Sequence, residues 1–241
     1  IIDITTLYFS FNFLYNPNLN IISSNIGAKN INITGNAIFN ANVSTTGDIS
    51  VSGTTKIACS SITTPGTTGN NGKQIYSGAV TITSSTTFSS ISTITFGSTI
   101  DGKTANAQNL TISAHNGTTK KAITFTGAVG STVPLGKVTV NYGEATANGA
   151  FSAQSLEITS NAKFTPAASS IVTLAGDFTN NGTFTHNNST VVFTDDAAIS
   201  GNTTFYNLTA ATGGKTLTVS DTQTVSNELT LKGAEDHLLA L

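Results

Sequence analysis

Charged residues are scarce in this chain of 241 residues, and several residue types are missing. Asp, Glu and Lys make up 9% of the sequence, and Arg, Met and Trp are absent, whereas globular proteins usually carry about 25% charged residues. A net charge of −2 without any guanidinium group excludes nucleic-acid binding through a basic stripe. Because disorder normally combines low hydrophobicity with high net charge, the 38% hydrophobic content and low net charge argue against a disordered chain.

Cysteine and long apolar runs are also scarce. The single cysteine, Cys59, excludes an internal disulfide, and we expect it to be a small buried side chain. No run of 18 apolar residues is present, so we expect no transmembrane segment. The chain begins at Ile1, lacks the basic region of a signal peptide and contains no Met, which favours a processed or excised piece of a longer product.

Thr, Ser and Asn are abundant instead, with 44, 26 and 25 residues, while the helix-forming residues Leu, Ala and Glu are comparatively few. From about residue 26 onward, short β-branched runs alternate with Gly- and Asn-containing turns, and no helical pattern lies between them. The runs lie at 79–83, 92–96, 109–113, 122–126, 137–140, 155–159, 170–174, 191–194, 207–209, 215–219 and 228–231. The turn signals lie at 70–72, 101–102, 116–117, 148–149 and 180–182.

Such a repeated strand pattern without helices is typical of a sandwich, a barrel or a β-solenoid. The runs are very short, are not clearly paired by two-residue hairpin turns, and alternate inward apolar with outward Thr or Ser residues. Dense Thr, Ser and Asn can also stack as ladders of like side chains on parallel coils. We therefore predict an all-β, right-handed parallel β-helix, with a β-sandwich as the alternative. About 20 residues per coil would make roughly ten coils and a rod about 50 Å long.

The first 25 residues differ from the rest. Apolar side chains alternate with polar ones before Pro17, which predicts a strand with one apolar face. Its apolar residues are Leu7, Phe9, Phe11, Phe13 and Tyr15. We expect residues 1–25 to form an N-terminal strand with a cap or linker and residues 26–241 to form the solenoid. The strand either caps its own solenoid or is exchanged into the next subunit by β-augmentation.

Several runs resemble the repeats of filamentous-haemagglutinin-like bacterial adhesins. The residues that carry this resemblance are Tyr76-Ser77-Gly78-Ala79-Val80-Thr81-Ile82, Thr95-Phe96-Gly97-Ser98-Thr99-Ile100-Asp101-Gly102, Asn109-Leu110-Thr111-Ile112, Thr124-Phe125-Thr126-Gly127-Ala128-Val129-Gly130 and Pro134-Leu135-Gly136-Lys137-Val138-Thr139-Val140. The stretch from Phe205 to Leu231 resembles a second repeat type of large bacterial surface proteins, and Asn16-Pro17-Asn18-Leu19 is similar to a tetrad of two-partner-secreted exoproteins, whose companion Asn-Pro-Asn-Gly motif is missing here. The resemblance implies an extracellular location on the bacterial cell surface and a role in adhesion or fibre formation.

Parallel β-helices also include polysaccharide-processing enzymes, so catalysis is the main alternative function. Their sites need clustered carboxylates, but Asp195-Asp196 is the only adjacent acidic pair besides Glu235-Asp236. Neighbours in a strand point to opposite faces, so we expect Asp195 and Asp196 to lie in a solvated turn. The three histidines, His115, His186 and His237, show no metal-ligand spacing, and we predict a non-catalytic protein with no cofactor or metal.

Six Thr-x-Thr units raise ice binding as a further alternative. They begin at Thr81, Thr93, Thr124, Thr183, Thr216 and Thr222. An ice-binding face needs such units in register on successive coils, and their irregular spacing argues against it.

The expected partners are further copies of the chain, in fibres or end-to-end stacks, and a glycan or protein receptor of a host or neighbouring cell.

Overall fold

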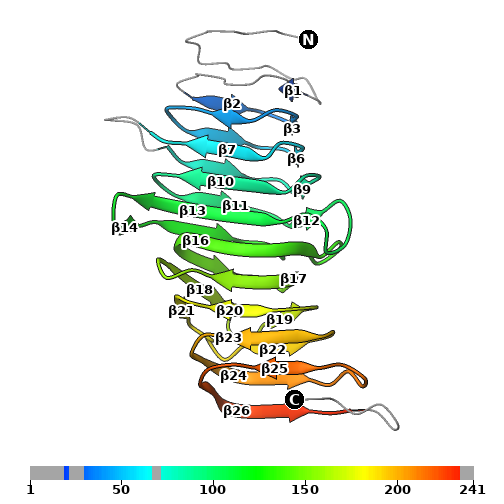
Figure 1. Cartoon of the computed structure of the whole chain (residues 1–241). Helices are drawn as coiled ribbons and strands as arrows, with labels where there is room; N and C mark the ends of the chain where they lie inside the picture. The colour runs from blue at the N-terminus through cyan, green and yellow to red at the C-terminus, as the bar shows by residue number, and fades with distance from the viewer. Residues whose placement is uncertain (1–18, 22–29, 67–71, 234–241) are drawn as a thin grey trace.

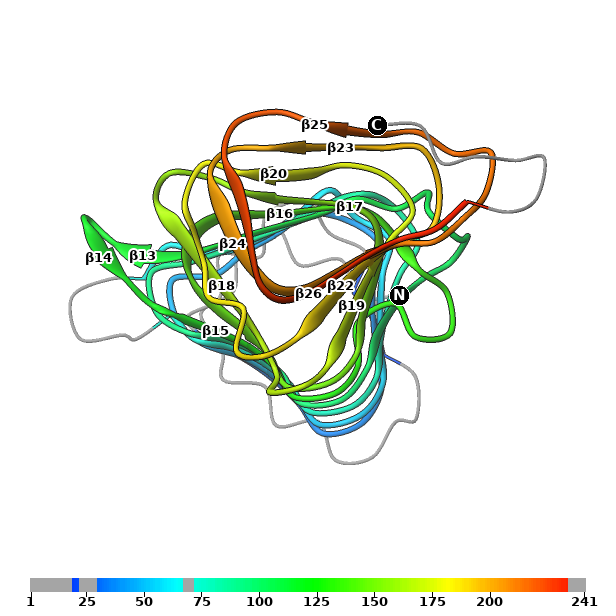
Figure 2. The same cartoon turned by 90° about the horizontal axis from the view of Figure 1, so that it is seen from below.

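The computed structural model describes residues 19–21, 30–66 and 72–233, with backbone only at 19–21. These residues form a right-handed parallel β-helix of about ten turns, with no helix among them. The coils stack from β1 to β26 (Figure 1) and enclose a triangular cross-section when viewed along the axis (Figure 2). The predicted fold class is confirmed, whereas the predicted N-terminal strand of residues 7–15 lies outside the described residues.

The three sides of the triangle are three parallel sheets, which we call face 1, face 2 and face 3. Face 1 contains β1 (Leu19–Ile21), β3 (Ala37–Phe39), β6 (Thr55–Ile57), β9 (Val80–Ile82), β12 (Ile100–Gly102), the start of β17 (Phe151–Ile158), β19 (Ile171–Leu174), β22 (Thr190–Phe193) and the ends of β24 (Thr203–Ala210) and β26 (Gln223–Leu231). Face 2 contains β4 (Val43–Ser44), β7 (Ser61–Thr64), β10 (Thr86–Ser90), β13 (Leu110–Asn116), the middle of β16 (Leu135–Ala147), the end of β17, β20 (Phe178–Asn180), β23 (Ala197–Ser200) and β25 (Leu217–Val219). Face 3 contains β2 (Ile31–Ile33), β5 (Ile49–Val51), β8 (Gln74–Tyr76), β11 (Ile94–Phe96), β15 (Ala122–Phe125), the end of β16, β18 (Ala162–Pro166), β21 (Thr183–Phe184) and the starts of β24 and β26.

Pairing between coils is parallel throughout, which excludes the antiparallel sandwich that was the alternative. Coil length varies: the paired residues Val191 and Leu208 are 17 positions apart, whereas Ile100 and Val129 are 29 apart. The additional residues of long coils lie at corners and in one hairpin, so the strands stay in register. Every strand predicted from residue 79 onward is present in the structure.

Aromatic side chains fill the interior. On face 3, Tyr76, Phe96 and Phe125 stack coil upon coil, with ring centroids 5.5 and 5.2 Å apart. Phe88 meets Phe96 edge to face from face 2, at 5.2 Å. All four side chains are fully buried. Because pairs in these geometries are favourable beyond simple area burial, the ladder stabilises the stacking of successive coils.

The corners show how Asn, Asp and Gly residues join successive coils. At the corner between faces 1 and 2, side-chain oxygens accept backbone N–H groups of the next coil, as Asn109 Oδ1 does from Lys137 (2.8 Å) and Asp177 Oδ1 from Ala198 (2.8 Å). At the corner between faces 3 and 1 the backbones approach closely, since a Cβ on Gly53 would lie 2.5 Å from the Gly35 carbonyl oxygen.

Three local features differ from the simple coil. The stack includes β1, which precedes residue 26 and pairs with β3. Asp101-Gly102, which we predicted as a turn, is part of β12, because the chain turns only afterwards. Finally, Asn116-Gly117 forms the predicted turn inside a long coil, as an antiparallel hairpin in which β14 (Thr119–Lys120) pairs with the end of β13.

Candidate functional surfaces

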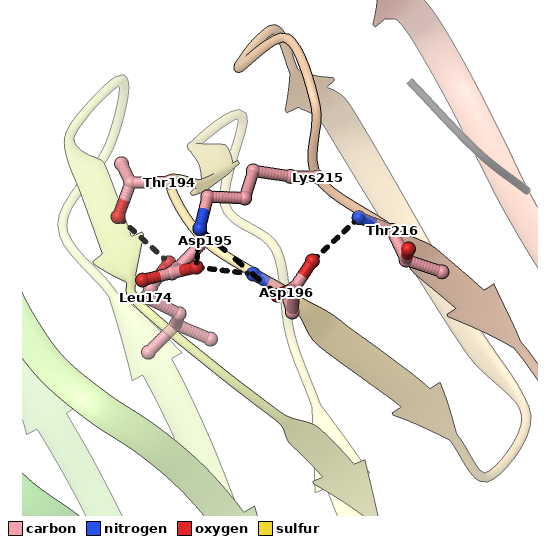
Figure 3. Close-up of polar contacts among 6 residues, drawn as sticks. All are labelled: Leu174, Thr194, Asp195, Asp196, Lys215 and Thr216. Carbon is pink, nitrogen blue, oxygen red and sulfur yellow. Dashed lines mark hydrogen bonds and ion pairs between the residues drawn. The ribbon is translucent and has the colours of Figure 1, made fainter. Parts of the chain in front are cut away.

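The adjacent acidic pair lies in a turn between β22 and β23, as expected (Figure 3). Lys215, from the turn of the next coil, forms an ion pair with Asp195 at 2.6 Å and approaches Asp196 at 4.0 Å. Asp195 Oδ1 accepts the N–H of Asp196 (2.8 Å), and Asp196 Oδ1 accepts the N–H of Thr216 (2.7 Å). The two carboxylates thus join neighbouring coils at a solvated corner.

Charge at this corner shifts the pKa of Asp195 and the pKa of Lys215. The hydrogen bond from Lys215, followed by that from the Asp196 N–H, lowers the pKa of Asp195. Reciprocally, the hydrogen bond to Asp195 raises the pKa of Lys215. Both shifts favour the charged forms. Such a pair is suited to holding two turns together. A carboxylic general acid needs a raised pKa, and the pKa of Asp195 is shifted in the opposite direction.

Two of the three histidines pack on tyrosines. The rings of His115 and Tyr142 have centroids 4.1 Å apart, and those of His186 and Tyr206 are 5.7 Å apart. His237 lies outside the described residues. Within the described ranges, no group of three His, Cys, Asp or Glu side chains is arranged to hold a metal ion.

Cys59 is buried near the corner between faces 1 and 2, as predicted. Burial raises the pKa of its thiol, and Sγ lies 3.7 Å from the carbonyl oxygen of Ser61. A protonated, buried thiol is a poor nucleophile, so this residue acts as part of the core.

The Thr-x-Thr units lie on different faces, but outward Thr residues are nevertheless in register. On face 3, Thr95, Thr124, Thr146 and Thr165 form one column over four consecutive coils. The Thr-x-Thr units themselves are not in register on successive coils, as their irregular spacing indicates, since Thr95 of one unit pairs with Thr124, the first residue of the next. Only single outward Thr residues align, because the corners absorb the variation in coil length. Face 2 carries two further columns in which Ser and Asn accompany Thr, so the Thr-x-Thr pattern does not reveal them.

The last described coil exposes apolar residues at inward positions. Leu208 and Ala210 are 4% and 3% exposed, whereas Leu229 and Leu231, their partners one coil later on β26, are 53% and 38% exposed. Val219 on β25 is 48% exposed, although its partner Ile199 is fully buried. Among the described strands, β26 pairs only with β24. The exposure of these side chains was not evident from the sequence, because their strands have the same alternation as buried ones.

In comparisons with known proteins, no family model, curated protein or solved structure matches this chain. No helix in the part of the chain that the structure describes is long and apolar enough to cross a membrane.

Proposed function

We propose that the chain is a non-catalytic rod segment of an extracellular bacterial surface structure, a fibre or adhesin whose solenoids join end to end. The observation that carries the proposal is the exposure of three inward apolar side chains on the last described coil, Val219, Leu229 and Leu231, which we call the open end. A second copy stacked on this end would cover these side chains and pair with the edge of β26. A head-to-tail contact of this kind does not close on itself and gives an open filament.

The sequence supports the same proposal independently. The alternation of Leu7, Phe9 and Phe11 with polar residues predicts a strand that could add to an open edge of a neighbouring copy. The resemblance to filamentous-haemagglutinin-like repeats supports export and a place at the cell surface. Neutral faces rich in Thr, Ser and Asn suit an exposed rod without disulfides.

Charge placed at the open end tests the proposal. The double variant Leu229→Lys/Leu231→Lys should abolish concentration-dependent filaments, as followed by light scattering and negative-stain microscopy. Ile171→Lys is the matched control, because Ile171 is 52% exposed on the side of the rod. It should assemble like the unmodified chain. Filaments that survive the double variant, or an unmodified chain that stays monomeric, would refute end-to-end assembly.

Deleting residues 1–16 tests the role of the N-terminal strand. If the strand is exchanged between copies, the shortened chain should stay folded and lose assembly. If the strand caps its own solenoid, the shortened chain should instead unfold at a lower temperature and aggregate. Unchanged stability and assembly would remove residues 7–15 from the proposal.

The enzymatic alternative has its own test. The adjacent carboxylates Asp195 and Asp196 are engaged by Lys215 and by the Thr216 N–H, which supports a structural role for them. Incubation with a panel of acidic and neutral polysaccharides should give no turnover. Release of new reducing ends or unsaturated sugars would contradict the proposal of a non-catalytic rod.

A further inference from the structure

Face 2 presents two columns of hydroxyl and amide groups in the middle of the rod. Thr87, Thr111 and Thr139 are paired in one half-buried column, and in the second column Ser89 is paired with Ser113, which is buried. The exposed Asn141 supplies the amide of the second column, and its Nδ2 donates to Ser113 Oγ at 3.3 Å. Members of a column repeat every ~4.8 Å, and the columns are ~6.6–6.8 Å apart along the strand. The result is a regular array of hydrogen-bonding groups, which we call the face 2 array.

An aromatic pair lies beside this array. His115 is two residues beyond Ser113 on β13 and so falls on the same outward side. Its ring packs on Tyr142, with centroids 4.1 Å apart. Tyr142 Oη donates to the Thr118 carbonyl (3.1 Å), and His115 Nδ1 lies 2.9 Å from the Gly117 carbonyl oxygen. The β13–β14 hairpin thus fixes both half-buried rings in place at the edge of face 2.

Charge around the array is nearly balanced. Lys137, at the edge of the array, forms a 2.7 Å ion pair with Glu157 on the next coil. Lys120 lies opposite His115 in the hairpin and is the nearest other cation along the paired strands. An array of hydroxyls and amides without net charge complements an uncharged ligand better than an anionic one.

We propose that the face 2 array and the Tyr142–His115 pair together bind an extended, uncharged polysaccharide lying along the rod axis. Sugar hydroxyls exchange hydrogen bonds with the Thr column and with Ser89 and Asn141, and one sugar ring packs against the aromatic pair. The coil repeat is comparable with the length of one sugar unit in an extended glycan, so successive coils meet successive sugars. This surface adds a lateral attachment site to the proposed rod and does not depend on end-to-end assembly.

The test uses the full chain and two neutral probes, cellulose particles in a pull-down assay and hydroxyethyl cellulose in affinity electrophoresis. The unmodified chain should be retained by both. Tyr142→Ala should weaken retention about tenfold, while Tyr142→Phe, which keeps the ring, should retain binding. Thr111→Lys/Thr139→Lys should abolish retention.

Thr124→Lys/Thr146→Lys is the matched control, because these residues form an equivalent half-buried outward column on face 3. This control should bind like the unmodified chain, and thermal melting of every variant separates loss of binding from loss of fold. Equal loss in both double variants, or no retention of the unmodified chain by either probe, would overturn the proposal. Retention only by sulfated polysaccharide, or thermal hysteresis without glycan binding, would also overturn it.

Discussion

The middle coils and the last described coil are built from the same alternating strands, yet their inward side chains have opposite environments. Phe96 on β11 is covered by Tyr76 on one side and Phe125 on the other, and it is fully buried. Leu229 has an equivalent inward position on β26 and pairs with Leu208 on the preceding coil, but it is half exposed. Burial in a solenoid therefore depends on the presence of a coil on both sides, since each repeat contacts only its neighbours.

Truncation of an inward side chain should give the largest difference in the free energy of unfolding between the middle coils and the last described coil. Phe96→Ala removes a fully buried ring from the aromatic ladder and should lower the free energy of unfolding by about 3–5 kcal/mol. Leu229→Ala should change it by less than about 0.5 kcal/mol, as for an exposed side chain. Urea unfolding of monomeric protein measures both. Equal costs would contradict the difference in burial.

The close backbone approach at the corner between faces 3 and 1 should produce the next largest effect. Gly53→Ala places a Cβ 2.5 Å from backbone atoms of Gly35 and should cost about 1–3 kcal/mol. Gly97→Ala meets its nearest backbone atoms at 3.1 Å and should cost less. The difference in thermal midpoint between the two variants checks this prediction. If Gly53→Ala were as stable as the unmodified chain, the corners would be less tightly stacked than described.

The buried phenol of Tyr76 should make the middle coils sensitive to alkali. Its Oη donates to Gln74 Oε1 at 3.2 Å, and burial raises the pKa of Tyr76 well above 10.0. The folded state keeps a proton that the unfolded state loses, so stability should be full below the unfolded pKa and fall as pH rises above it. Unfolding at several alkaline pH values should show a smaller slope for Tyr76→Phe than for the unmodified chain. An identical slope would show that Tyr76 is not responsible.

The smallest effect is expected near the last coil, at Asp195 and Lys215. The pKa of Asp195 is lowered, so its contribution to stability is present above the unfolded pKa and is lost as pH falls through the folded value. Both groups are solvent exposed, so the effect should be slight and screened by salt. Lys215→Ala should flatten the acid limb of thermal stability slightly in low salt. A large change would point to a role beyond joining two turns.

Much of the fold could be predicted from the alternation of apolar and polar residues within the short runs. The alternation in residues 92–96 and 122–126 correctly placed Phe96 and Phe125 inside and Thr95 and Thr124 outside. The pairing of the strands was harder to predict from the sequence, because the same runs are compatible with a β-sandwich. Only contacts between residues far apart in the sequence distinguish the two folds. Register across the 29 positions from Ile100 to Val129 depends on a hairpin that absorbs the added residues.

The candidate surfaces were harder to predict. Leu229 and Leu231 have the same sequence pattern as buried strands, and their exposure follows from the neighbouring coil alone. The face 2 array was hidden because its columns combine Thr, Ser and Asn from coils of unequal length. The packing of His115 on Tyr142 depends on the hairpin that turns at Asn116, and no local sequence motif predicts this packing.

Small-angle X-ray scattering of the unmodified chain over a concentration series tests the central claim most directly. If the open end at β25 and β26 joins solenoids, mass and length should increase with concentration while the radius of gyration of the cross-section stays constant. A particle mass that does not change with concentration would contradict end-to-end assembly. Growth accompanied by a thicker cross-section would contradict it equally, because copies would then associate through their sides.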